Sequence, residues 1–168
     1  WNVSNVTNMR WMFLDAFSFN GNLSNWDVSN VVTMERMFTR AESFNQDISN
    51  WDVSNVTNML GMFQEASSFN QPLDNWNVSS VDKMDLMFAY NPMFNQNIST
   101  WDVSNVTRMP EMFKEATSFN QDISNWDVSN VTNMADIFSE ANSLSDGNSC
   151  SIHQLSLIHI SEPTRLRS

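Results

Sequence analysis

The sequence has few of the residues that catalytic and metal sites require. Its 168 residues contain one cysteine, Cys150, two histidines and three glycines that do not cluster. A single cysteine excludes a disulfide framework and a thiolate metal site, and scattered glycines exclude a phosphate-binding loop. Both histidines, His153 and His159, lie near the C-terminus, which leaves the rest of the chain without a histidine general base. We therefore expect no enzyme and no cofactor.

Positive charge is also scarce. Eight Lys and Arg residues stand against nineteen Asp and Glu, a formal net charge of −11. Nucleic-acid binding normally needs a basic footprint, so neither nucleic acid nor anionic lipid is an expected partner. No apolar run approaches the length of a membrane span, which argues against direct membrane insertion. With 41% hydrophobic residues, including seven Trp and twelve Phe, the chain is nevertheless too apolar to be disordered.

What the sequence does have is a strict internal repeat. Tryptophan recurs every 25 residues from Trp1 to Trp126, and the nine residues WDVSNVTNM at 51–59 return unchanged at 126–134. Self-similarity at such a period is typical of solenoids and other repeat proteins. We predict one elongated domain over residues 1–148, followed by a non-repeat tail, 149–168, that is disordered or a sequencing artefact. The units are 1–25, 26–50, 51–75, 76–100, 101–125 and 126–148.

Apolar spacing within a unit predicts two kinds of element. In the unit 26–50, Val31, Met34, Phe38 and Ala41 are three, four and three residues apart, the pattern of an amphipathic helix of two to three turns. Around the boundary with the next unit, Trp51-Asp52-Val53 alternates apolar and polar residues, as a half-buried strand does. With Ile48, these residues also reproduce the L-x-x-L-x-L spacing of leucine-rich repeats. The predicted fold is an α/β, leucine-rich-repeat-like right-handed solenoid of six 25-residue repeats, with short parallel strands on one face and short helices on the other.

Rows of identical residues have a structural interpretation. The asparagines are expected to bond main-chain groups where the chain turns, and the methionines to lie in the core. Trp11, which no other unit matches, is expected to be exposed. The asparagine rows are Asn5, Asn30, Asn55, Asn105, Asn130 and Asn20, Asn45, Asn70, Asn95, Asn120; the methionine rows are Met9, Met34, Met59, Met84, Met109, Met134 and Met12, Met37, Met62, Met87, Met112.

The string W-D-V-S-N-V-T-N-M, followed by M-F and then F-N-Q-D-I-S-N, resembles the 25- to 26-residue repeats of BspA-like leucine-rich-repeat surface proteins and mycoplasma-type lipoproteins. The resemblance covers residues 1 to about 145. It implies an extracellular or cell-surface protein used in adhesion or partner binding. The chain begins on Trp1 without an initiator methionine or a signal peptide, so we expect a fragment of a longer protein.

The second residue of each unit is the strongest candidate for a binding site. The strand alternation predicts that these residues, with the serine two positions later, point away from the core. Such an acidic row suits a basic protein partner, or weak binding of divalent cations; alternatively, it only keeps the surface soluble. The tentative partner-binding residues are Asp27, Asp52, Asp102, Asp127, Ser29, Ser54, Ser104 and Ser129.

Two functions remain open at this point. The first is a cell-surface interaction or adhesion module that binds protein or glycan through the Asp/Ser face. The second is a structural stalk or spacer without a ligand of its own. Exposed ends of a repeat array can also pair, so end-to-end self-association is a further expectation. The stretch 155–165 has none of the repeat pattern and resembles the translation of a sequencing adapter, so no function is assigned to it.

Overall fold

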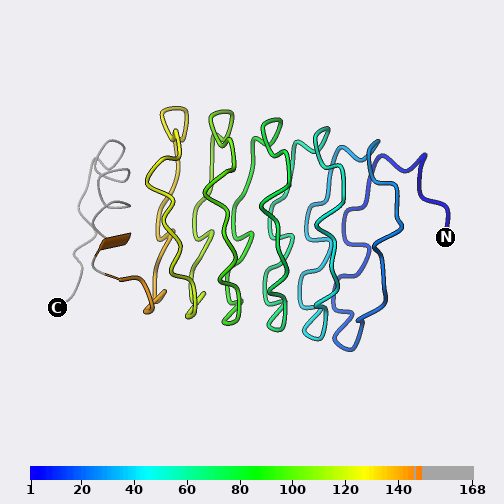
Figure 1. Cartoon of the computed structure of the whole chain (residues 1–168), viewed down its shortest axis with the longest axis horizontal. Coiled ribbons are helices and arrows are strands. Elements are labelled where there is room, and N and C mark those ends of the chain that lie inside the picture. The colour runs from blue at the N-terminus through cyan, green and yellow to red at the C-terminus, as the bar shows by residue number, and fades with distance from the viewer. Residues whose placement is uncertain (146, 149–168) are drawn as a thin grey trace.

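The computed structural model of the chain describes residues 1–145 and 147–148. The chain winds into a stack of coils that runs from the N-terminus toward the C-terminus (Figure 1), with one coil for each 25-residue unit. We number the positions of each coil 1 to 25 from its tryptophan. The predictions made for the tail, for Cys150 and for the two histidines concern residues outside those described.

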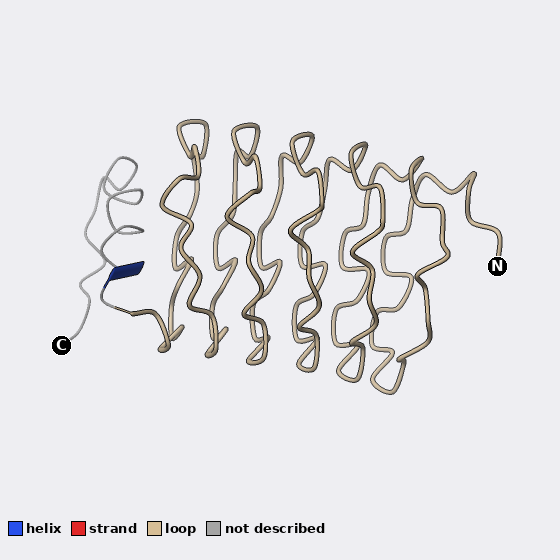
Figure 2. Ribbon diagram, viewed as in Figure 1, coloured by secondary structure: helices blue, strands red, loops and turns tan. Residues whose placement is uncertain are grey.

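The predicted α/β leucine-rich-repeat-like solenoid is wrong. The described residues contain no strand, and only residues 147 and 148 are helical (Figure 2). Instead, each pair of neighbouring coils is joined by one isolated parallel bridge, always at position 8. With a single bridge per pair of coils, the described part of the chain forms neither a parallel sheet nor a layer of helices. The bridges join Asn8 to Thr33, Thr33 to Asn58, Asn58 to Lys83, Lys83 to Arg108 and Arg108 to Asn133.

The expected helix is replaced by consecutive turns between positions 9 and 16. In the second coil, the Met37 N–H donates to the Met34 carbonyl three residues earlier, at 3.1 Å, whereas the Phe38 N–H donates to Met62 of the next coil, at 2.9 Å. An α-helix requires each N–H to donate to the carbonyl four residues earlier. Because alternate amides bond across coils, that ladder cannot form.

Left-handed residues at positions 11 and 15 make these turns possible. Every coil has φ between +52° and +62° at both positions, and only Gly61 among them is glycine. Each is the third residue of a four-residue turn, where type II turns require a positive φ. No β-branched residue occupies either position, as the steric cost of this conformation demands. The residues are Trp11, Arg36, Gly61, Leu86, Glu111 and Asp136 at position 11, and Asp15, Arg40, Glu65, Tyr90, Glu115 and Glu140 at position 15.

The stretch predicted as a strand is also built from turns. The Trp51 N–H donates to the Ile48 carbonyl at 3.1 Å, and the Val56 N–H donates to Val53 at 2.9 Å. The predicted alternation of burial is nevertheless confirmed, since Trp51 and Val53 are buried and Asp52 is exposed. An inward-outward alternation therefore arises here without a sheet.

Columns of identical side chains fill the interior of the stack. Phe63 is fully buried and stacks on Phe38 and Phe88 of the adjacent coils, with ring centroids 5.7 Å away in both directions. Within its own coil it lies 4.0 Å from Phe69, which belongs to a second phenylalanine column. The methionine rows are buried as predicted, except that Met12 is 37% exposed and Met134 is only partly buried. Trp11 is 49% exposed, as predicted. Each coil thus buries its apolar residues chiefly against copies of themselves.

The structure confirms the asparagine ladders. The Asn70 N–H donates to Asn45 Oδ1 at 3.0 Å, and the Gln71 side-chain amide donates to the same oxygen at 2.9 Å. The Asn55 side chain donates to the Ser29 carbonyl of the preceding coil at 2.8 Å. These side chains satisfy main-chain groups that have no partner within their own coil.

Candidate functional site

The structure exposes the candidate aspartates, as the alternation of burial predicts. Asp27, Asp52, Asp102 and Asp127 are exposed. Ser29, Ser54 and Ser104 are half-buried, and Ser129 is exposed. The apolar residues on either side of each aspartate, a tryptophan and a valine, pack into the core and hold the carboxylate outward.

Each aspartate is held by the serine two residues later. Asp27 Oδ1 accepts hydrogen bonds from the Ser29 N–H at 3.1 Å and from its hydroxyl at 2.6 Å. The same two bonds, with the same lengths, occur in the coils that carry Asp52 and Asp102. The carbonyl of Ser29 is in turn bound by Asn55 of the next coil. These contacts fix the carboxylates in equivalent orientations from coil to coil.

The serine contacts also lower the pKa of Asp27, Asp102 and Asp127. The Ser29 hydroxyl and, to a smaller extent, the Ser29 N–H lower the pKa of Asp27 below its ordinary value of 3.8. The hydroxyl and N–H of Ser104 lower the pKa of Asp102, and the nearby charge of Asp127 opposes this only weakly. Hydrogen bonds to the charged form of a carboxyl favour that form.

Further exposed aspartates lie at positions 22 and 24, close in sequence to position 2 of the following coil. Asp47 and Asp122 at position 22 are exposed, and the N–H groups of Ser49 and Ser124, with a smaller contribution from the hydroxyls, lower their pKa values. Asp74, at position 24, is also exposed. Asp47 and Asp122 were not predicted from the sequence, although each begins a D-x-S triplet like those at position 2. We define the acidic face as Asp27, Asp47, Asp52, Asp74, Asp102, Asp122 and Asp127.

No basic side chain neutralises the acidic face in the part of the chain that the structure describes. None of its aspartates belongs to an ion pair there. All the basic residues within residues 1–145 occur between positions 8 and 15 of their coils, in the segment of consecutive turns. They are Arg10, Arg36, Arg40, Lys83, Arg108 and Lys114.

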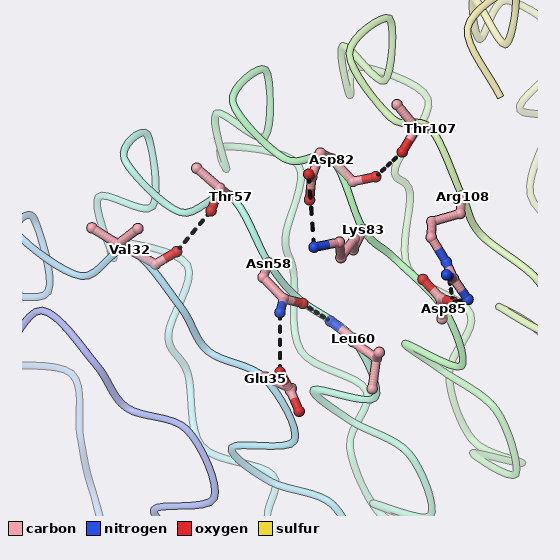
Figure 3. Close-up of polar contacts among 10 residues, drawn as sticks. All are labelled: Val32, Glu35, Thr57, Asn58, Leu60, Asp82, Lys83, Asp85, Thr107 and Arg108. Carbon is pink, nitrogen blue, oxygen red and sulfur yellow. Dashed lines mark hydrogen bonds and ion pairs between the residues drawn. The ribbon is translucent and has the colours of Figure 1, made fainter. Parts of the chain in front are cut away.

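Most of these basic residues pair with acids of their own segment. Arg108 Nη2 lies 2.6 Å from Asp85 of the preceding coil, whose side chain is only 5% exposed (Figure 3). Arg10 and Arg40 pair with Glu35 and Asp15 at 2.7 and 2.8 Å. The basic residues are therefore confined to the segment of consecutive turns, and the acidic face carries none of them.

The described residues also bear on metal and membrane binding. Among them, no three His, Cys, Asp or Glu side chains lie close enough to hold a metal ion. In the same part of the chain, no helix is both long and apolar enough to cross a membrane.

Comparison with known protein families gives a match over most of the chain. A family model described as "Mycoplasma protein of unknown function, DUF285" matches residues 1–92 and, a second time, residues 73–158. No curated protein and no solved structure gives a significant match.

Proposed function

This chain belongs to the DUF285 family, and from that premise we propose that it is an interaction module that binds protein or glycan on another surface through its acidic face. The observation that carries the proposal is the separation of charge: the carboxylates of the acidic face have no basic partner within the described residues, whereas the basic residues there lie in another segment of each coil. An unpaired row of like charge attracts a partner of opposite charge and speeds its association.

Its rigid geometry supports this role. Aspartate occupies position 2 in four of the six coils, and a serine orients it in each. After Asp27 and Asp102, an asparagine of the next coil also binds the carbonyl of that serine. A partner therefore meets charges whose positions are set before binding, which lowers the ordering cost of association. The family is described only as one of unknown function. The finer resemblance, to BspA-like proteins, favours an extracellular or cell-surface location and a role in adhesion.

The experiment compares the whole chain with a variant in which Asp27, Asp52, Asp102 and Asp127 are all changed to Asn. Both are tested against immobilised matrix proteins, glycans and intact cells at low and at physiological salt. We expect binding by the wild type that weakens with salt, because exposed charges are screened, and that is lost in the variant.

A matched control removes four exposed carboxylates that form no ion pair and lie outside the acidic face. It carries Glu42→Gln, Glu115→Gln, Asp136→Asn and Glu140→Gln. Net charge changes equally in the two variants. Equal losses of binding in the two variants would show that only net charge matters. Undiminished binding by the acidic-face variant would contradict the proposal.

The second candidate is a structural spacer without a ligand of its own. The continuous phenylalanine columns and the repeated hydrogen bonds between coils favour it, since they make a stiff, uniform stack. Absence of binding by the wild-type chain to every member of the panel would favour this alternative. A spacer also predicts that the same four substitutions leave its stability and shape unchanged.

A further inference from the structure

One rung of the asparagine ladder differs from the others at the residue that follows the asparagine. In the first rung, Asn20 Oδ1 accepts a hydrogen bond from the Asn45 N–H at 3.0 Å and another from Gln46 Nε2 at 2.9 Å. The next three rungs repeat this pair of donors on the asparagine oxygen. Glutamine follows the asparagine in these rungs, but Gly21 follows Asn20.

The glycine leaves the main-chain nitrogen of residue 21 open. A Cβ atom there would lie 2.9 Å from Phe19 Cε2, so the ring occupies the space that a side chain would need. Asn20 and Gly21 are both exposed. Among the described residues, no group accepts a hydrogen bond from the Gly21 N–H. The nitrogen therefore has no side chain on its own residue and no hydrogen-bond acceptor in the described structure.

We propose that Asn20 is a site of self-catalysed deamidation. The Gly21 nitrogen attacks Cγ of Asn20, forming a C–N bond, while the Cγ–Nδ2 bond breaks and ammonia leaves with the proton that Gly21 gives up. Water then opens the resulting five-membered imide at either carbonyl and leaves aspartate or isoaspartate. As Cγ becomes tetrahedral, negative charge develops on Oδ1, where the Asn45 N–H and Gln46 Nε2 already donate. Two preorganised donors at about 2.7–3.1 Å from a developing oxyanion are the arrangement that stabilises acyl-transfer transition states.

The two products have different effects on the stack. An aspartate at position 20 keeps an oxygen in place for both donors, and hydrogen bonds to a charged acceptor are stronger than those to a neutral one. An isoaspartate lengthens the main chain by one carbon and disturbs the rung between the first two coils. Both products therefore add a negative charge. The aspartate product keeps the ladder, whereas the isoaspartate product interrupts it.

The first measurement is peptide mass mapping of the full chain during incubation at neutral pH, with the aspartate and isoaspartate peptides separated by chromatography. Asn45, Asn70, Asn95 and Asn120 serve as internal controls, because they occupy the same ladder and are not followed by glycine. We expect conversion at Asn20 several-fold faster than at any of these four. Equal rates at all five asparagines would overturn the proposal.

A pair of variants tests the role of the donors. Gln46→Leu removes one of the two donors to Asn20, and Gln71→Leu removes the corresponding donor to Asn45. We expect Gln46→Leu to slow conversion at Asn20 several-fold and Gln71→Leu to leave it unchanged. An unchanged or faster rate in the Gln46→Leu chain would show that the donors do not assist the reaction.

Discussion

At the scale of single residues, the turns depend on a main-chain conformation that most side chains resist. For residues other than glycine, the left-handed region costs roughly 1–2 kcal/mol. Eleven such residues adopt it at positions 11 and 15, each with a positive φ. Their strain is offset by the hydrogen bonds that alternate amides make to the next coil. A substitution at these positions should therefore act through the main chain more than through side-chain contacts.

Gly61 allows a direct test of this strain. Gly61→Ala places a Cβ atom at φ +59°, 3.1 Å from Arg36 Cγ, so we expect the free energy of unfolding to fall by about 1 kcal/mol. Urea denaturation of the two chains measures the difference. Gly147→Ala is the control, since a Cβ atom there meets nothing within 4 Å. A loss of stability as large in the control as in Gly61→Ala would contradict the explanation.

The acidic face predicts a dependence on pH. Asp27, Asp47, Asp102, Asp122 and Asp127 have pKa values below the ordinary 3.8 in the folded chain. The unfolded chain therefore binds protons more readily than the folded chain in acid. Their contribution to stability is complete above the unfolded value and disappears as pH falls through the folded values. We expect the free energy of unfolding to fall as pH is lowered from about 5 through this acidic range, as urea titrations at a series of pH values would show.

Serine substitutions separate the sources of this effect. Ser29→Ala and Ser104→Ala remove the hydroxyl, which is the larger cause of the lowered pKa of Asp27 and of Asp102. We expect both pKa values to move up toward 3.8 in carboxyl-carbon NMR titrations. Ser49→Ala should move the pKa of Asp47 less, because the main-chain N–H is the larger cause there. Identical shifts in the three variants would rule out this assignment.

At the scale of the coil, burial could be predicted from the sequence but secondary structure could not. Val31, Met34, Phe38 and Ala41 are all buried, as their spacing predicts. Consecutive turns produce the same spacings of three and four residues as a helix does. The local sequence does not show whether an N–H donates to the carbonyl four residues earlier or to a carbonyl of the next coil. Positions 11 and 15 never carry a β-branched residue. This weak sequence signal could be interpreted only when the structure showed a positive φ at both positions.

The candidate site was predicted in part for similar reasons. Exposure of Asp27, Asp52, Asp102 and Asp127 follows from the alternation with buried Trp and Val, and the structure confirms it. The confinement of basic residues to positions 8–15 is visible in the sequence once the positions are numbered. The serine hydrogen bonds depend on main-chain turns that the expected strand would not have formed. They therefore required the three-dimensional structure.

The ladder that joins coils can be tested at Asn70. Asn70→Ala removes the oxygen that accepts hydrogen bonds from the Asn95 N–H and from Gln96, at 3.0 and 2.9 Å. We expect a loss of about 1–2 kcal/mol in the free energy of unfolding, since the Asn95 N–H loses its acceptor and the half-buried Gln96 amide keeps only the Asn70 carbonyl. Asn142→Ala, at an exposed position, should change stability by less than about 0.5 kcal/mol in the same urea measurement. Equal effects would mean that the ladder contributes little.

At the scale of the whole molecule, each coil is stabilised by its neighbours. In such arrays, stability is approximately a sum of repeat and nearest-neighbour contributions. Phe63 stacks on rings in two adjacent coils, whereas Phe13 stacks on Phe38 of one adjacent coil. The same side chain should therefore matter more in the middle of the stack than in its first coil.

The comparison of Phe63→Ala with Phe13→Ala measures this difference. Removal of a fully buried phenylalanine typically costs about 3–5 kcal/mol, and we expect Phe63→Ala to fall in that range. Phe13 is only partly buried, so we expect roughly half that loss for Phe13→Ala. Hydrogen exchange of the adjacent coils would locate the weakened contacts. A larger loss for Phe13 than for Phe63 would contradict the nearest-neighbour description.

Most side-chain hydrogen bonds between coils run in one direction. The side chains of Gln46 and Asn55 donate to acceptors of the coil before them, and the Trp51 indole donates to the Leu23 carbonyl 28 residues earlier. Later coils repeat these bonds. The Thr39 hydroxyl runs the other way and donates to the Gly61 carbonyl of the next coil. Because a ribosome makes a protein from its N-terminus, each new coil emerges with most of these side-chain donors, and its carbonyls accept from main-chain N–H groups of the coil made just before. The stack can therefore be assembled during synthesis, in the order of translation, with each finished coil serving as the template for the next.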